Sequence, residues 1–276
     1  MPTARLHDGS TIEVTVRGAG PTILLPISTA VIEGEQAEEM RAWGADPGNG
    51  HTLAAGLADA GFRVVTADYE GHLAAHPKPL TLTADAVASD LLSVADAAGA
   101  DRFAYYGYSW LALSGLQLAI RTDRLTALAM GGYPPLGGPY EAMLGVTRTA
   151  HRLALDPPPP PTGPAVPGDW DSVPFTLTPD QTRQYVTLYE SLRDFDDRRV
   201  RLDIPRLAFA GDEDDIQYGE SWDNAHVSMA GPLRRNREEL KAYGWEVVLI
   251  PKADHLVAMR AATVLPLLTP WLKSSL

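Results

Sequence analysis

The sequence predicts an α/β protein with a doubly wound, mostly parallel sheet of about eight strands that carries a cap insertion. Three observations support this prediction. Short apolar runs, which suit strands covered on both faces, alternate with helical patterns along most of the chain. The alternation breaks at a stretch with five consecutive prolines, Pro157 to Pro161, and resumes after it. Residues 1–133 and 204–276 are therefore assigned to one core domain, and residues 134–203 to a cap.

The first part of the core begins with a hairpin pattern over residues 4–17, around the turn Asp8-Gly9-Ser10. Four glutamates between residues 30 and 50 indicate a solvated helix or loop. Apolar runs predict strands, and helical periodicity ending near glycines predicts helices. The expected strands are 22–25, 62–67, 103–106 and 125–130, and the expected helices are 49–60, 83–98 and 110–121.

The proline run favours extended polyproline geometry and excludes a helix locally. A helix over about 180–199 follows it inside the cap. In the second part of the core the alternation of strands and helices resumes with four elements. The last of them is a helix that Pro266 and Pro270 are expected to interrupt. These elements are strand 206–211, helix 232–243, strand 245–250 and helix 258–273.

Composition narrows the possible partners. The chain has 276 residues, and its 35 acidic and 23 basic side chains give a net charge of −12. This charge argues against nucleic acid and against an anionic membrane surface, so a small-molecule substrate is expected. The N-terminus has no apolar signal segment, and no apolar run is long enough for a membrane span. We expect a cytoplasmic monomer or homodimer.

No cofactor or metal is expected. The sequence has no cysteine, which excludes disulfides, thiolate metal sites and a cysteine nucleophile, and which fits a reducing compartment. Asp223 and His226 lie three residues apart, but no third ligand joins them. There is no dinucleotide-binding fingerprint.

The strongest chemical signal is Gly107-Tyr108-Ser109-Trp110-Leu111, between an expected strand and an expected apolar helix. A serine on such a tight turn projects above the carboxyl edge of the sheet. The N–H groups that follow it lie at a helix N-terminus, where negative charge is stabilised. The segment therefore predicts an exposed serine nucleophile.

Two further motifs follow in the order of a Ser–Asp–His triad. Gly211-Asp212-Glu213-Asp214 comes directly after the strand that follows the cap, and Asp254-His255 comes after the last strand. With these three motifs the chain resembles the α/β-hydrolase superfamily over nearly its whole length. The resemblance implies that Ser109 is the nucleophile, His255 the general base and Asp214 the triad acid. Asp212 and Asp215 stay open as alternative acids.

The resemblance also implies an oxyanion hole and a pocket. One donor would be the N–H of Trp110, and the other would come from Ile27 or Ser28 after the strand 22–25. Aromatic and apolar side chains offer few polar groups around the serine, so we expect an apolar pocket whose access the cap controls. The candidate substrate-binding residues are Tyr108, Pro26, Tyr69, Tyr133 and Trp170.

The sequence departs from the superfamily pattern at three places: Leu111 is bulky, Pro26-Ile27 replaces His-Gly, and Asp254 stands where glycine is common. The main hypothesis is a serine hydrolase that cleaves a carboxylic ester or lactone of a small-to-medium apolar substrate through an acyl-enzyme. The departures motivate one alternative, a cofactor-free lyase, cyclase or oxygenase with the same fold. A ligand-binding module with a slow triad is the other alternative.

Overall fold

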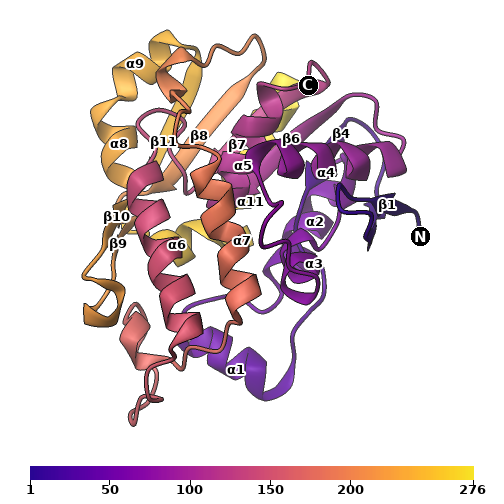
Figure 1. The fold of residues 1–276 in the computed structure, drawn as a ribbon. Coiled ribbons are helices and arrows are strands. Elements are labelled where there is room, and N and C mark those ends of the chain that lie inside the picture. The colour runs from indigo at the N-terminus through magenta and orange to yellow at the C-terminus, as the bar shows by residue number, and fades with distance from the viewer.

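The computed structural model describes all 276 residues, and a central sheet of seven strands organises it (Figure 1). The strand order is β11-β8-β7-β6-β4-β5-β3, and every neighbouring pair is parallel except β3 with β5. The doubly wound, mostly parallel sheet is thus confirmed. Its strands are β3 (Thr15–Arg17), β4 (Thr22–Leu25), β5 (Arg63–Thr66), β6 (Phe103–Tyr108), β7 (Leu125–Gly131), β8 (Arg206–Gly211) and β11 (Trp245–Ile250).

The sheet has seven strands instead of eight because the N-terminal hairpin stays apart from it. β1 (Thr3–Arg5) and β2 (Thr11–Glu13) pair only with each other. The turn between them is held by polar contacts, since Lys78 Nζ forms an ion pair with Asp8 and donates to Ser10 Oγ at 3.0 Å. The Lys78 side chain is only 1% exposed. The ion pair therefore attaches the hairpin to the segment that precedes α4 (Ala84–Ala97), the helix that packs against β1.

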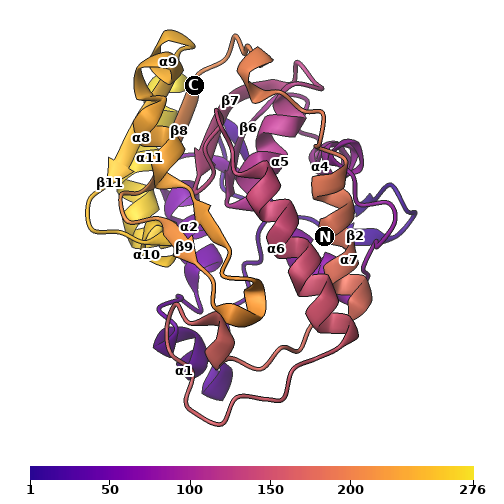
Figure 2. The same cartoon turned by 60° about the vertical axis from the view of Figure 1, so that its left-hand side comes forward.

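Helices cover both faces of the sheet (Figures 1 and 2). α4 and α5 pack together on one face, and α2 and α11 pack together on the other. Residue Leu24 of β4 contributes to the first of these two cores, whereas Ile23 and Leu25 contribute to the second. The three buried positions of the strand, Ile23 to Leu25, are all apolar for that reason. These helices are α2 (Asn49–Asp59), α4 (Ala84–Ala97), α5 (Trp110–Ala119) and α11 (Ala261–Ser275).

The expected interruption of the last helix is wrong, because α11 continues through Pro266 and Pro270. Each proline removes one backbone donor, which leaves the carbonyls of Ala262 and Pro266 without their helical partners. All three residues are exposed, so water can bind these carbonyls. No helix of the protein combines the length and the apolar character that crossing a membrane requires.

Several smaller elements differ from the expectation or were not anticipated. The expected helix 232–243 is two short helices that meet at Asn236. A hairpin of two short strands follows β8, and short helices follow β4, β5 and β11. These elements are α1 (Gly34–Ala42), α3 (Tyr69–Ala75), β9 (Asp215–Gln217), η3 (Glu220–Trp222), β10 (His226–Ser228), α8 (Ala230–Arg235), α9 (Arg237–Ala242) and α10 (His255–Met259).

The segment between β7 and β8 contains two long helices that lie side by side in both views (Figures 1 and 2). The expected helix over 180–199 ends nine residues early, and a second helix before the prolines was missed. That helix buries Thr147 and Thr149 together with Leu144, so its buried face does not read as a simple apolar stripe. The elements are α6 (Tyr140–Leu155), η1 (Trp170–Ser172), α7 (Pro179–Glu190) and η2 (Asp197–Arg199).

Helix α7 is hydrogen-bonded to residues 73–84 of the core, whereas the chain that leads into it is not. We call residues 156–178 the strap. Apart from bonds within the strap and to α7, its only side-chain hydrogen bonds are those between Asp171 and Ser221. Four side chains anchor α7: Gln181 donates to the Ala74 carbonyl, Gln184 donates to the Leu73 carbonyl and accepts from the Lys78 N–H, Thr187 donates to the Pro79 carbonyl, and Ser191 accepts from the Ala84 N–H.

Candidate active site

The strand order places a crevice at the carboxyl ends of β4 and β6. From β4 the chain moves to β5 on one side, and from β6 it moves to β7 on the other. The loops after two such strands diverge, which opens a crevice where ligands bind in open α/β sheets. Ile27 and Ser28 follow β4, and Ser109 follows β6. The sheet topology alone therefore brings these sequence-predicted residues to one edge.

Ser109 occupies a strained turn between β6 and α5. Its φ is 55° and its ψ is −131°, a conformation that L-residues rarely adopt, and its N–H donates to the Gly131 carbonyl at 2.8 Å. Gly107 is required two residues earlier, because a Cβ there would overlap the carbonyl of Leu111. The bulky Leu111 is compatible with the turn because only its backbone faces Gly107, while its side chain is buried in the core.

Asp214 and His255 form a bonded pair. Nδ1 of His255 lies 2.9 Å from both carboxylate oxygens of Asp214, whose side chain is fully buried. Burial raises the pKa of Asp214, and the hydrogen bond with His255 opposes that shift. The two alternative acids have other partners: Asp212 accepts from the Lys252 N–H at 2.7 Å, and Asp215 lies 3.9 Å from His226. The pair leaves Nε2 of His255 free for a proton.

The backbone of His255 is fixed from two sides. Asp254 caps α10 by accepting from the Val257 N–H at 2.7 Å, so the residue that stands where glycine is common has a structural task here. Tyr108, next to the serine in sequence, donates its hydroxyl to the His255 carbonyl at 2.7 Å, and the two rings lie 5.0 Å apart. The Tyr108 side chain thereby connects the serine turn to the histidine.

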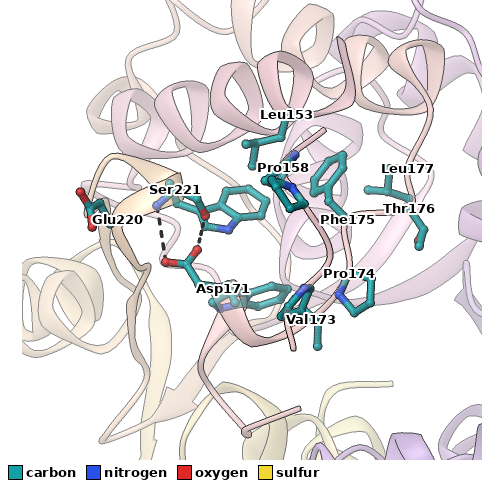
Figure 3. Close-up of a pocket in the computed structure, with 14 residues that line it drawn as sticks. Leu153, Pro158, Asp171, Val173, Pro174, Phe175, Thr176, Leu177, Glu220 and Ser221 are labelled. Atoms are coloured by element: carbon teal, nitrogen blue, oxygen red, sulfur yellow. Dashed lines mark hydrogen bonds between the residues drawn. The ribbon is translucent and has the colours of Figure 1, made fainter. Parts of the chain in front are cut away.

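Ser109 and His255 line neighbouring cavities, and no hydrogen bond joins them. Ser109 lines a cavity of about 190 Å³, the Ser109 cavity, and His255 lines one of about 270 Å³, the His255 cavity. Trp170 lines both of them, and also the strap cavity of about 570 Å³ that Figure 3 shows. Catalytic hydrogen bonds often tighten only when substrate binds, so this layout is compatible with a working serine–histidine pair.

Backbone N–H groups are available near the serine. Trp110 is the first residue of α5, so its N–H has no acceptor within the helix. The N–H groups of Ile27 and Ser28 donate to no other atom of the protein. Close packing fixes this loop, because a Cβ on Gly50 would overlap the Ser28 carbonyl. Free N–H donors thus follow both β4 and β6, and such donors are the groups from which an oxyanion hole is built.

Aromatic side chains surround the Ser109 cavity. Tyr185 and Tyr189 come from consecutive turns of α7, and their four-residue spacing is a sequence signal that both lie on one face of the helix. Tyr218 and Trp222 come from the chain after β8. Residues of this cavity carry no charge: Ser109, Trp110, Met143, Val146, Thr147, Ala150, Trp170, Leu177, Thr182, Tyr185, Tyr189, Tyr218 and Trp222.

The other candidate substrate-binding residues lie elsewhere. Tyr69 is buried and donates to Asp90 at 2.8 Å, and Tyr133 is buried with its hydroxyl unpaired. Pro26 is buried after β4, and Tyr108 is engaged with His255. None of these four residues lines the three cavities, whereas Trp170 lines all of them.

Glu70 contacts Trp110, the residue that follows Ser109. Its carboxylate accepts from the Trp110 indole N–H at 2.6 Å. Although Glu70 is exposed, partial desolvation of its carboxylate raises the pKa of Glu70, and the hydrogen bond from Trp110 opposes the shift. Trp110 also packs edge-on against Tyr185, with ring centroids 5.4 Å apart. The wall of the Ser109 cavity is thus held in place by both core and inserted helix.

Solved structures match nearly the whole chain, whereas no protein-family model and no curated protein matches it. An enol-lactonase from Burkholderia xenovorans LB400 matches at a TM-score of 0.62 and 21% identity, over 99% of this chain and 100% of its own. An esterase from Thermogutta terrifontis matches at 0.59 and 18%, over 99% and 97%. The epoxide hydrolase VrEH1 from Vigna radiata matches at 0.59 and 15%, also over 99% and 97%.

A bromoperoxidase and an epimerase also match at similar TM-scores, so the shared architecture does not specify a reaction. The sheet order, the serine turn after β6, and the acid and histidine after β8 and β11 agree with the resemblance that the motifs suggested. The chain has the α/β-hydrolase fold.

Proposed function

We propose that the protein is a serine hydrolase that cleaves a carboxylic ester or lactone of a small-to-medium apolar substrate. The observation that carries the proposal is the bond between Nδ1 of His255 and the buried carboxylate of Asp214, at the sheet edge that also presents Ser109. This bond fixes the imidazole tautomer with its free nitrogen as a base. The enol-lactonase and the esterase among the matched structures support the same reaction class.

The reaction follows from the roles of these groups. His255 takes the hydroxyl proton of Ser109 while the oxygen attacks the substrate carbonyl. The N–H of Trp110 and one N–H of Ile27 or Ser28 stabilise the oxyanion that forms. His255 then protonates the leaving oxygen, and a water molecule, activated by the same imidazole, releases the acid and restores the serine. The inserted segment, residues 134–203, acts as a cap that limits access.

The test is covalent labelling of the wild type, Ser109→Ala and His255→Ala with a fluorophosphonate, read by intact mass. One adduct on the wild type that is missing from both variants is expected, followed by Ser109-dependent turnover in a panel of esters and lactones. Labelling of Ser109→Ala, or ester turnover that survives this substitution, would contradict the proposal. Folding of each variant is checked by circular dichroism.

The second candidate is a non-hydrolytic enzyme of the same fold, a cofactor-free lyase, cyclase or oxygenase. The missing hydrogen bond between Ser109 and His255 favours it, as does the range of reactions among the matched structures. Such an enzyme converts its substrate without accumulating an acyl-enzyme. A binding module with a slow triad would instead show ligand-dependent thermal stabilisation and negligible turnover.

A further inference from the structure

The two cavities beside the catalytic pair differ in chemistry, and that difference points to the two halves of the substrate. The Ser109 cavity has no charged residue. The His255 cavity contains three carboxylates, those of Glu213, Asp215 and Asp254, and neither a lysine nor an arginine lines it. Two indoles, Trp43 and Trp170, lie on its wall.

The mechanism assigns each cavity to one part of an ester. The acyl carbon becomes bonded to the serine oxygen, so the acyl group stays with Ser109. The leaving oxygen receives its proton from His255, so the alcohol departs on the histidine side. A substrate that spans the catalytic pair therefore has its acyl group in the uncharged cavity and its alcohol among the carboxylates.

The His255 cavity has the features of a site for a positive charge. The rings of Trp43 and Trp170 lie 5.4 Å apart and are tilted by 57°, so they form an aromatic corner on the wall of the cavity. Aromatic faces attract cations, and tryptophan does so best. Glu213 has no salt-bridge partner, and Asp215 has only the 3.9 Å contact with His226. The carboxylates and the aromatic rings of this cavity both favour a positively charged group.

Two arginines lie near the His255 cavity without lining it, and one of them, Arg234, donates to the carbonyl of Asp212, beside Glu213. Arg260 lies close to Trp43 in the chain fold, but its guanidinium donates to the Gly44 carbonyl and does not line the cavity. Asp254 also caps α10, where its carboxylate accepts the N–H bond from Val257. The charged residues that line the strap cavity are also acidic, namely Asp171 and Glu220.

We propose, building on the serine hydrolase function, that the substrate is an ester of an apolar acid with a cationic amino alcohol. The acyl group binds in the Ser109 cavity and the ammonium group in the His255 cavity, against Trp43, Trp170, Glu213 and Asp215. The Ser109 oxygen bonds to the carbonyl carbon, the bond from that carbon to the alcohol oxygen breaks, and the serine proton passes through His255 to the leaving alcohol. Water then releases the acid.

The test compares kcat/KM for butyrylcholine with that for 3,3-dimethylbutyl butyrate, in which a carbon replaces the charged nitrogen at the same shape. Wild type is expected to prefer the cation by about fivefold or more, within the range of about 2- to 30-fold that a cation–aromatic contact supports. The preference is expected to shrink as salt rises, because carboxylates at the surface are screened. An anionic ester of similar size, 2-carboxyethyl butyrate, is expected to be the poorest substrate.

The preference is expected to shrink, without being lost, in the double variant Glu213→Gln, Asp215→Asn, because the two indoles and Asp254 remain. The matched control is Glu13→Gln, which removes an unpaired carboxylate from β2, in the N-terminal hairpin that stays apart from the central sheet. Equal or lower kcat/KM for the cation in wild type, with Ser109-dependent turnover of the neutral ester, would overturn the inference and leave the hydrolase proposal intact. Labelling of Ser109 without turnover of any of the three esters would also overturn it. Absence of both labelling and turnover would overturn both proposals.

Discussion

Replacing Tyr108 by phenylalanine tests whether the serine turn controls the position of His255. The substitution keeps the ring that packs 5.0 Å from the imidazole and removes only the hydroxyl that donates to the His255 carbonyl. A half-buried carbonyl that loses its partner costs about 1–2 kcal/mol of unfolding free energy. A catalytic group displaced by about 1 Å can lose about 10²-fold in rate, so we expect kcat to fall by about tenfold to a hundredfold with little change in KM.

The control for this variant is Tyr106→Phe. Tyr106 lies on the same strand and is also buried, but its hydroxyl has no hydrogen bond in the protein. Urea denaturation measures the loss of unfolding free energy, and stopped-flow acylation by an ester substrate measures the fall in rate. If Tyr108→Phe matches Tyr106→Phe in both measurements, the bond to the His255 carbonyl does not position the base.

Three further predictions concern single groups. Asp214→Asn is expected to slow acylation by about 10⁴-fold while the fold is kept, because an amide no longer fixes the imidazole tautomer; stopped-flow kinetics and circular dichroism measure this, and a loss below tenfold would contradict it. Burial raises the pKa of Asp8, but the hydrogen bonds from Lys78 and Ser10 and the charge of Lys78 together outweigh it and hold the pKa well below its usual range. Asp8→Asn is therefore expected to cost about 3 kcal/mol of unfolding free energy at pH 7. Asp8 contributes that stability above its unfolded pKa, so the gap between wild type and variant should close as pH falls below about 4; a gap independent of pH in urea titrations would refute this. Gly107→Ala is expected to destabilise the protein by about 3 kcal/mol or more, whereas Gly145→Ala, at an exposed and open position of α6, should stabilise it by about 0.5–1 kcal/mol. Thermal melts that rank these two variants the other way would contradict the packing argument.

The sequence predicted the sheet well because its signals are local. Each buried strand reads as a short apolar run, and the chemistry-bearing residues follow three of those runs directly. The order of the motifs along the chain was therefore enough to anticipate that Asp214 and His255 would follow β8 and β11. The local pattern did not distinguish the acid that bonds the histidine, since Asp212, Asp214 and Asp215 differ only in the direction that the chain takes after β8. Only the resemblance pointed to Asp214.

The composition of the pocket was less predictable because it depends on contacts between distant segments. Tyr69 and Tyr133 sit near strand ends in the sequence, but both turn into the core. Tyr218 and Trp222 follow Asp214 closely, and they reach the cavity only because the hairpin β9–β10 carries them toward the strap, where Trp170 stacks on Tyr218 at 5.5 Å. Such placement is decided by packing and not by any local pattern.

The unequal anchoring of the inserted segment has a consequence for how the site opens. Helix α7 is held to residues 73–84 by four polar side chains, while the strap is bonded to the core side only through Asp171 and Ser221. Local unfolding begins where the fewest contacts must break, so the strap should open and close while α7 stays docked. Trp170, which borders all three cavities, travels with the strap. Exchange of amide hydrogens should therefore be fast in residues 162–173 and slow in α7. The rate of product release should equal the rate at which the strap opens.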